Sequence, residues 1–412
     1  MPALALVLLP GAARAQQPRP VTLAQAIEAA LAAPRIALAR ADSAAAQAQV
    51  RIARAFPNPS LSYDHSIAVP VHHLIAEQPL EYPWVRAARI RAAATGASAA
   101  DYLLLAERAA VRHDVELGYA HAAGAREIRG LAERNVRDAD ELVRIATARR
   151  AAGDASELDV LLAGVVAGQA RNAFLTDSLT EISSLLDLQV LMGLDAQRLE
   201  IALADSLDML PAAAPAAGAF PAVPTLVAAA RATATSEAAT LAETRLGRLP
   251  APAVRAGIER GDPSQPGNLP LFGISLPIPL WNRSRGEVAA ATAATDRARA
   301  SLALAELDTR NAIARSERER ALARDRVTRD RTVVRDAQRV AELSLTAYHE
   351  GAYPLAGVLE AQRSARDAMR QFVEDLTAAR TAEADYVFAR TAGAEAVGAA
   401  PPAAAPPGGG AP

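Results

Sequence analysis

The chain has 412 residues, a formal net charge of −2 and no cysteine, and all 44 of its basic residues are arginine. Without cysteine or lysine it has no cysteine zinc site, iron–sulfur cluster, P-loop lysine or Schiff base. The near-neutral charge gives no reason to expect a nucleic-acid partner. Alanine makes up about a quarter of the sequence. It favours helix and buries little area, which predicts long, closely packed helices.

Residues 1–15 have the pattern of a secretory signal peptide. Ala3 to Leu9 is an apolar run, and Ala13-Arg14-Ala15 fits the small-x-small cleavage pattern. No later segment has 18 consecutive apolar residues, so no membrane-spanning helix is expected. Membrane insertion of this chain would therefore have to use β-strands.

The prolines are clustered, and the stretches between the clusters predict two very long helices. No proline lies between Val85 and Leu210, and only Pro354 lies between Leu280 and Ala400. Because proline breaks helix interiors, these stretches permit helices over 86–152 and 284–350. Their apolar residues recur at steps of three and four, which is typical of coiled coils.

The sequence also repeats itself. The spacing between Pro79 and Pro277 equals the spacing between Gly153 and Gly351. An apolar run that ends in Val-Leu follows each glycine. The repeat predicts two homologous halves joined by a Pro/Ala-rich linker. The predicted organisation is a signal peptide at 1–15, a first repeat at 16–209, the linker at 210–224, a second repeat at 225–394 and a disordered tail at 395–412.

Each half is predicted to run helix, strand, strand, long helix, turn, helix. The first helix is expected over 22–56, with Thr22 as its N-cap. Strand candidates at 60–70 and 72–82 alternate apolar and polar residues, as do segments around 254–259 and 272–278. Segments of about 10 residues suit membrane β-strands.

These lengths define the predicted fold class. At 1.5 Å per residue each long helix extends ~100 Å, with two shorter helices stacked beside it. Four strands cannot close a membrane barrel, so other copies must complete it. Two chains would give eight strands and three would give twelve, and only the larger barrel could hold an open channel. The prediction is a mainly α protein of duplicated helical hairpins, with four strands per chain.

At this point the sequence resembles TolC-type outer-membrane efflux proteins. The resemblance rests on Thr22 to Ala26 opening a helix, the Pro57-Asn58-Pro59 turn and two glycine-centred tips. The stretch Leu276 to Glu287 is most like the CzcC branch, which is associated with metal-cation efflux. The family implies a homotrimer with a twelve-stranded barrel in the outer membrane of a Gram-negative bacterium. It also implies a helical tunnel in the periplasm, a periplasmic adaptor (membrane fusion) protein and an inner-membrane pump, as in RND efflux systems.

Under this resemblance the two hairpin tips become adaptor contacts. The family's first tip often carries Gly-x-x-Ser, which matches here, whereas Pro354 stands where serine is common at the second. The alternative is an ordinary helix hairpin, in which glycine ends one helix and Asp or Pro begins the next. The expected contacts are Gly153, Asp154, Ser156, Gly351, Ala352 and Tyr353.

The resemblance also implies a gate at the closed end of the tunnel. Tyr348 and Asp159 match a tyrosine and an aspartate that share a polar network in well-known members. Glu360 matches one of two acidic residues that narrow the pore, but Gly357 replaces the other and Tyr353 replaces an arginine. A ring of carboxylates at such a constriction would attract cations.

Three histidines, His65, His72 and His73, lie near the first pair of strands. They can be metal ligands or simply polar residues of an extracellular rim, and the second interpretation is preferred. No cofactor or metal is expected as a resident group.

The sequence favours a passive efflux duct for metal cations or small toxic compounds. The alternatives are a periplasmic coiled-coil scaffold or adaptor and a type I protein secretion duct. A scaffold would have no use for membrane-length strands. An enzyme is not expected, because the chain has no Gly-x-Ser-x-Gly elbow and no zincin histidine pair.

Overall fold

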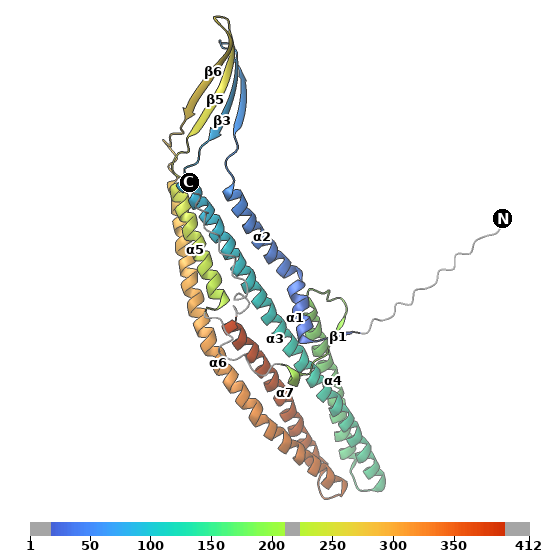
Figure 1. The fold of residues 1–412 in the computed structure, drawn as a ribbon. Helices are drawn as coiled ribbons and strands as arrows, with labels where there is room; N and C mark the ends of the chain where they lie inside the picture. Colours follow the sequence, from blue (N-terminus) through green and yellow to red (C-terminus); the bar gives the residue numbers. More distant parts are fainter. Residues whose placement is uncertain (1–17, 211–222, 392–412) are drawn as a thin grey trace, which may run out of the picture. The chain divides into compact units, whose positions relative to one another are not determined.

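The computed structural model describes residues 18–210 and 223–391, drawn in colour in Figure 1. The expected signal peptide, nearly all of the expected linker and the expected tail lie outside these residues. Within them, each half of the chain contributes a helical segment, two strands, one very long helix and a returning helix, in that order.

The described residues form two compact units. The first comprises residues 18–33, 111–210 and 316–387, and the second comprises 34–110, 223–315 and 388–391. The long helices α3 (Pro83–Ala152) and α6 (Arg285–His349) contribute to both units.

The second unit holds one antiparallel sheet built from both halves of the sequence (Figure 1). Its strands are β2 (Ser60–His65), β3 (His72–Pro79), β5 (Ala253–Asp262) and β6 (Gln265–Ser275). They pair in the order β2-β3-β5-β6, so β2 and β6 are edge strands. Four strands are present as predicted, with shorter bounds at the first hairpin, whereas the fourth, expected around 272–278, lies at 265–275. At the first hairpin β2 ends at His65, and Ser66 closes the turn through its N–H to the carbonyl oxygen of Val71 at 2.8 Å.

The two faces of this sheet differ in polarity. Cross-strand partners in an antiparallel sheet share a face, so the register assigns each residue. One face carries the apolar residues Leu61, Tyr63, Leu74, Ala76, Val254, Ala256, Ile258, Phe272 and Ile274. The other carries most of the polar ones, including Ser60, Ser62, Asp64, His73, Glu77, Arg255 and Glu259. Phe272 and Ile274 are 81% and 80% exposed, so the apolar face is uncovered in this chain.

Helices of the same unit pack in pairs through small and polar side chains. On α2 (Pro34–Arg54), the Ser43 hydroxyl donates to the Asp101 carboxylate of α3 at 2.6 Å. The Thr295 hydroxyl of α6 donates to the Glu237 carbonyl of α5 (Thr225–Leu246) at 3.2 Å. The alanine-rich composition allows this close approach, because alanine keeps helix backbones near one another.

The prediction of one helix over 22–56 is wrong in one respect. Thr22 does cap a helix, in a capping box with Gln25, but this helix is α1 (Leu23–Ala32) and it ends before α2 begins at Pro34. Ala33 is extended, with φ −68° and ψ 162°. Proline disfavours helical backbone in the residue before it, which explains the break.

In the first unit, two three-residue strands that the sequence analysis did not predict pair in parallel. They are β1 (Arg19–Val21) and β4 (Ile201–Leu203). The fully buried Gln189 side chain holds the loop that leads to β4. Its amide donates to the carbonyls of Asp195 and Arg198 at 2.8 and 2.9 Å and accepts from the N–H of Glu200 at 2.7 Å. Without these bonds the fully buried amide of Gln189 would be left without hydrogen-bond partners.

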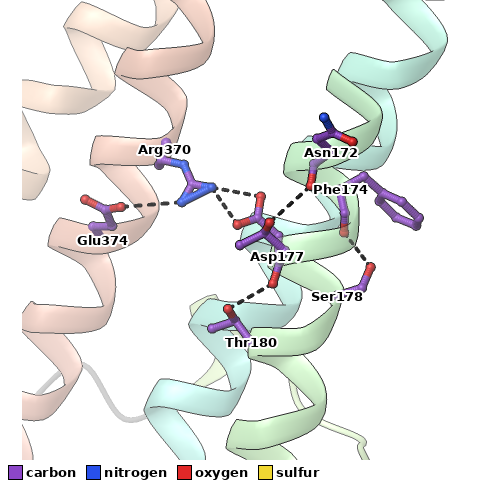
Figure 2. Close-up of polar contacts among 8 residues, drawn as sticks. Asn172, Phe174, Asp177, Ser178, Thr180, Arg370 and Glu374 are labelled. Carbon is purple, nitrogen blue, oxygen red and sulfur yellow. Dashed lines mark hydrogen bonds and ion pairs between the residues drawn. The ribbon is translucent and has the colours of Figure 1, made fainter. Parts of the chain in front are cut away.

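The same unit contains two helical hairpins, α3 with α4 (Glu157–Leu191) and α6 with α7 (Leu355–Thr391). A nearly buried carboxylate links the hairpins. Figure 2 shows Arg370 of α7 facing Asp177 of α4, with one guanidinium nitrogen 2.7 and 2.8 Å from the two carboxylate oxygens. Arg370 also lies 3.9 Å from Glu374, one turn along α7. Removing Arg370 would leave the nearly buried Asp177 carboxylate without its ion-pair partner, which is unfavourable. The pair therefore favours this arrangement of α4 against α7.

Helix α4 is the one described helix that is long and apolar enough, by length and composition, to cross a membrane. No such helix was expected because the sequence has no uninterrupted apolar run of this length, whereas α4 is apolar only on average. Little of its apolar segment is buried. Its exposed apolar side chains form two groups with steps of three and four, the spacing of a coiled-coil seam, and ten positions separate the groups. The first group is Leu158, Leu161 and Val165, and the second is Leu175, Leu179 and Ile182.

Candidate functional site

The first hairpin tip is closed by polar groups. α3 ends at Gly153, whose φ of 85° lies in the left-handed region that favours glycine. Ser156 caps α4, with its hydroxyl accepting from the N–H of Asp159 at 3.2 Å. The Asp159 carboxylate in turn accepts from the N–H and the hydroxyl of Ser156, both at 3.0 Å. This capping box fixes the direction in which α4 leaves the tip.

The second tip reaches a similar backbone by other means. Gly351 has φ 77°, and the N–H of Ala352 donates to the carbonyl of Ala347 at 2.9 Å. Pro354 directly precedes α7, and its carbonyl accepts from Gly357 and Val358 at 3.1 and 3.4 Å. Proline suits a helix start because its fixed φ is helical and its missing N–H is not needed there.

An apolar cluster packs the two tips together. Its buried members come from all four helices: Leu142, Ile145 and Ala146 of α3, Ala163 of α4, Tyr348 of α6, and Leu355 and Val358 of α7. Because each hairpin buries this surface against the other, the tips form one packed site.

Arg149 connects the two tips through its guanidinium group. One nitrogen donates to the backbone carbonyl of Tyr348 at 2.8 Å, and another donates to the carbonyl of Asp154 at 3.3 Å. The group also lies 4.5 Å from the centre of the Tyr348 ring, within cation–π range. Arg149 was not predicted as a site residue. Its only signal in the sequence is a basic residue in the last turn of a helix, where cations meet free carbonyls.

The expected polar link between Tyr348 and Asp159 is not formed in this chain. Tyr348 is only 3% exposed, and its hydroxyl has no hydrogen-bond partner among the described residues. The hydrogen bonds of the Asp159 carboxylate go to Ser156 instead. The tip thus contains a buried hydroxyl without a partner, which costs desolvation energy.

Gly357 and Tyr353, two of the three expected departures from the family pattern, contact each other. A Cβ atom added to Gly357 would lie 2.3 Å from Cε1 of Tyr353, far inside van der Waals contact. The Tyr353 ring therefore rests in the space that the glycine leaves. Any larger side chain at 357 would displace this ring, so the two residues are coupled.

The remaining predicted site residues lie on the surface of the tips. Asp154, Ala352 and Glu360 are exposed. Glu360 makes no hydrogen bond or ion pair within residues 18–210 and 223–391. Exposed polar groups of this kind are available to another protein.

A cavity of about 440 Å³ adjoins the apolar cluster, among α3, α6 and α7. Its wall includes Asp138, Arg366 and Gln362. Burial raises the pKa of Asp138, and burial lowers the pKa of Arg366. Both shifts record charged groups that are partly withdrawn from water. The helices are thus less closely packed here than at the tips.

No group of three or more His, Cys, Asp or Glu side chains that could hold a metal ion occurs in the described part of the chain. Near the sheet, the His65 and His72 side chains contact each other, while His73 pairs with Glu259 at 3.1 Å.

The fold resembles solved outer-membrane proteins over most of their length. The outer membrane protein VceC of Vibrio cholerae has a TM-score of 0.72 at 19% identity, covering 89% of this chain and 95% of that one. The CmeC outer membrane channel of Campylobacter jejuni gives 0.73 at 16%, covering 89% and 85%. The outer-membrane channel OprN gives 0.75 at 18%, covering 90% of each chain. At such identities the likeness establishes the fold.

Comparison with models of known protein families gives no match, and neither does comparison with the sequences of curated proteins.

Proposed function

We propose that this chain is a TolC-type outer-membrane duct of a tripartite efflux system. It works as a homotrimer in the outer membrane of a Gram-negative bacterium, with its helices in the periplasm. It catalyses no reaction, and substrates pass through it from an inner-membrane pump joined by a periplasmic adaptor.

The observation that carries this proposal is the sheet with two open edges and one uncovered apolar face. Unpaired backbone groups are not tolerated in lipid, so β2 and β6 need partners before the sheet can enter a bilayer. Three copies joined edge to edge make twelve strands. The apolar face would then contact lipid and the polar face would line the channel. The stacked rings of Tyr82 and Trp84, 4.9 Å apart, suit an interfacial aromatic girdle.

The exposed seam of α4 supports the same assembly. Its two groups of apolar side chains, at 158–165 and 175–182, each follow coiled-coil spacing but have no cover within one chain. A second copy of the chain would cover them with a helix of its own. The same surface would remain exposed to water in a monomer, which is unusual for a patch of this length.

The packed tips support a role in docking and gating. Glycine-centred turns present Asp154, Ser156, Ala352 and Tyr353 to an adaptor. We place the gate at the same site, with Arg149 as the residue that positions one tip on the other. Glu360 adds negative charge near the opening, which would favour cations over anions.

We propose metal cations or small toxic compounds as substrates, after the likeness of Leu276 to Glu287 to the CzcC branch. The test combines deletion in the host with reconstitution. Deletion should sensitise the host to such a compound only when the partner pump is present. The purified protein should be trimeric by mass in detergent and should form channels in planar bilayers.

The outcomes separate the candidate functions. A scaffold would give a water-soluble protein without conductance, and this result would overturn the proposal. A protein secretion duct would leave resistance unchanged on deletion but would remove a protein from the culture medium. If deletion changes neither resistance nor the set of secreted proteins, the efflux duct and the protein secretion duct are both excluded.

A further inference from the structure

The sheet carries a cluster of three side chains at the closed end of the β2–β3 hairpin. His65 and His72 are direct cross-strand partners, and Tyr63 lies two residues before His65 on the same face. Nδ1 of His72 is 3.4 Å from Nδ1 of His65 and 2.9 Å from the Tyr63 hydroxyl oxygen. Three donor atoms thus converge, and all three residues are exposed to solvent.

The spacing of the two ring nitrogens suits one shared metal ion. Imidazole nitrogens bind zinc at about 2.0–2.1 Å. Two nitrogens 3.4 Å apart at that distance subtend about 110° at the ion, which is the tetrahedral angle. Strand pairing already fixes both backbones, so only the side chains must turn for both Nδ1 lone pairs to point at the ion, and Nδ1 of His72 must release its contact with the Tyr63 hydroxyl.

The donor chemistry restricts the choice of ion. Neutral imidazole is a borderline ligand that prefers Zn²⁺, Cu²⁺ and Ni²⁺, whereas Ca²⁺ and Mg²⁺ prefer oxygen. The two imidazoles and the phenol provide three ligands, and water can complete the shell. Arg260 is the other cross-strand partner of His72, and its positive charge on this face weakens the binding of any cation.

We propose that His65 and His72, supported by Tyr63, form a binding site for a late first-row divalent metal ion. The site joins two neighbouring strands at their turn, so a bound ion would fasten this end of the sheet. It lies on the apolar face, whereas His73 and Glu259 lie on the polar face. In the proposed trimer the site would lie on the face away from the export route, whereas metal binding itself rests only on the sheet register and the side-chain geometry.

The experiment uses the full-length protein without a histidine tag, folded in detergent. Zn²⁺ is titrated by calorimetry at pH 7.5, and Cu²⁺ is added for electron paramagnetic resonance. We expect one Zn²⁺ site per chain and a Cu²⁺ spectrum with splitting from two nitrogens. His65→Ala and His72→Ala should each weaken binding at least about tenfold, as removal of a ligand-supporting group does.

His73→Ala is the matched control, since His73 is adjacent in sequence but lies on the opposite face. It should leave the affinity unchanged, and Arg260→Ala should strengthen binding. The proposal is wrong if Zn²⁺ binds the wild-type chain no more tightly than the His65→Ala/His72→Ala variant, or if His73→Ala weakens binding equally. The Cu²⁺ spectrum of the wild-type protein decides the matter if the variants do not fold, because a spectrum without two-nitrogen splitting excludes the site. Channel conductance is measured separately and tests only the proposed function.

Discussion

The tip at Gly153 is closed by polar groups, whereas the tip at Gly351 is closed by proline and by packing. Ser156 and Asp159 exchange three hydrogen bonds at the first. At the second, the Tyr353 ring fills the space above a glycine. Both turns share a glycine with positive φ, so the two hairpins turn at the same kind of residue but differ in the side chains that close them. The two tips thus present unlike surfaces, and Arg149 joins them.

The largest effect is expected from removing Arg149, which contacts both tips. Arg149→Ala deletes two hydrogen bonds from a charged donor and a cation–π contact, a loss of about 2–3 kcal/mol. Hydrogen–deuterium exchange at both tips should rise, and so should single-channel conductance. Arg150→Ala is the control, because Arg150 has an exposed ion pair with Glu157. Equal effects from the two variants would show that Arg149 does not join the tips.

The polar tip is tested by removing its cap. Ser156→Ala and Asp159→Ala should each destabilise the start of α4 by about 1 kcal/mol, the usual value of an N-cap. Exchange should increase over the first turns of α4 and remain unchanged at the second tip. Ser178→Ala is a matched control in mid-helix, where the hydroxyl donates to the Phe174 carbonyl. Spread of the effect to α7 would contradict independent capping of the two hairpins.

The packed tip is tested by filling its glycine. Gly357→Ala gains up to about 1 kcal/mol of helix propensity, but the new methyl group must displace Tyr353. When Tyr353 is present, we expect these two effects on thermal stability to offset each other. The same substitution in a Tyr353→Ala background should show the full gain in thermal stability. An identical change in both backgrounds would mean that the ring does not rest on Gly357.

The smallest effect is expected from Tyr348→Phe. The hydroxyl is buried without a partner, so its removal should leave stability within about 0.5 kcal/mol or raise it slightly. Conductance should also remain unchanged. An increase in conductance comparable to that of Arg149→Ala would mean that the assembled protein gives this hydroxyl a partner, as the family resemblance implies.

Local rules predicted much of the fold. Proline spacing located α3 and α6 within three residues at each end, and alternation located the first three strands of the sheet and the last four residues of the fourth. The break at Ala33 was missed because helical periodicity continues through Pro34. The strands β1 and β4 were missed because three residues carry no periodic signal, and a side chain distant in sequence, Gln189, holds β4.

The candidate site was less predictable. Gly153 and Gly351 were identifiable because a helix hairpin needs a left-handed residue. The contact of Arg149 with Tyr348 joins residues that are far apart in sequence, and its acceptor is a backbone carbonyl that every residue possesses. The pairing of Tyr353 with Gly357 follows from one ring orientation, which composition and spacing do not specify.

The open edges of the sheet have a consequence for folding. An edge strand with an apolar face is a template for aggregation while the chain is unassembled. β6 contains Pro266 and Pro270, and each proline removes one N–H group, which makes this edge a poorer template for unspecific pairing. β2 instead carries serine, aspartate and histidine. In the proposed homotrimer, closure of the sheet joins edges of different copies, so the last folding step should be second order or higher in chain concentration.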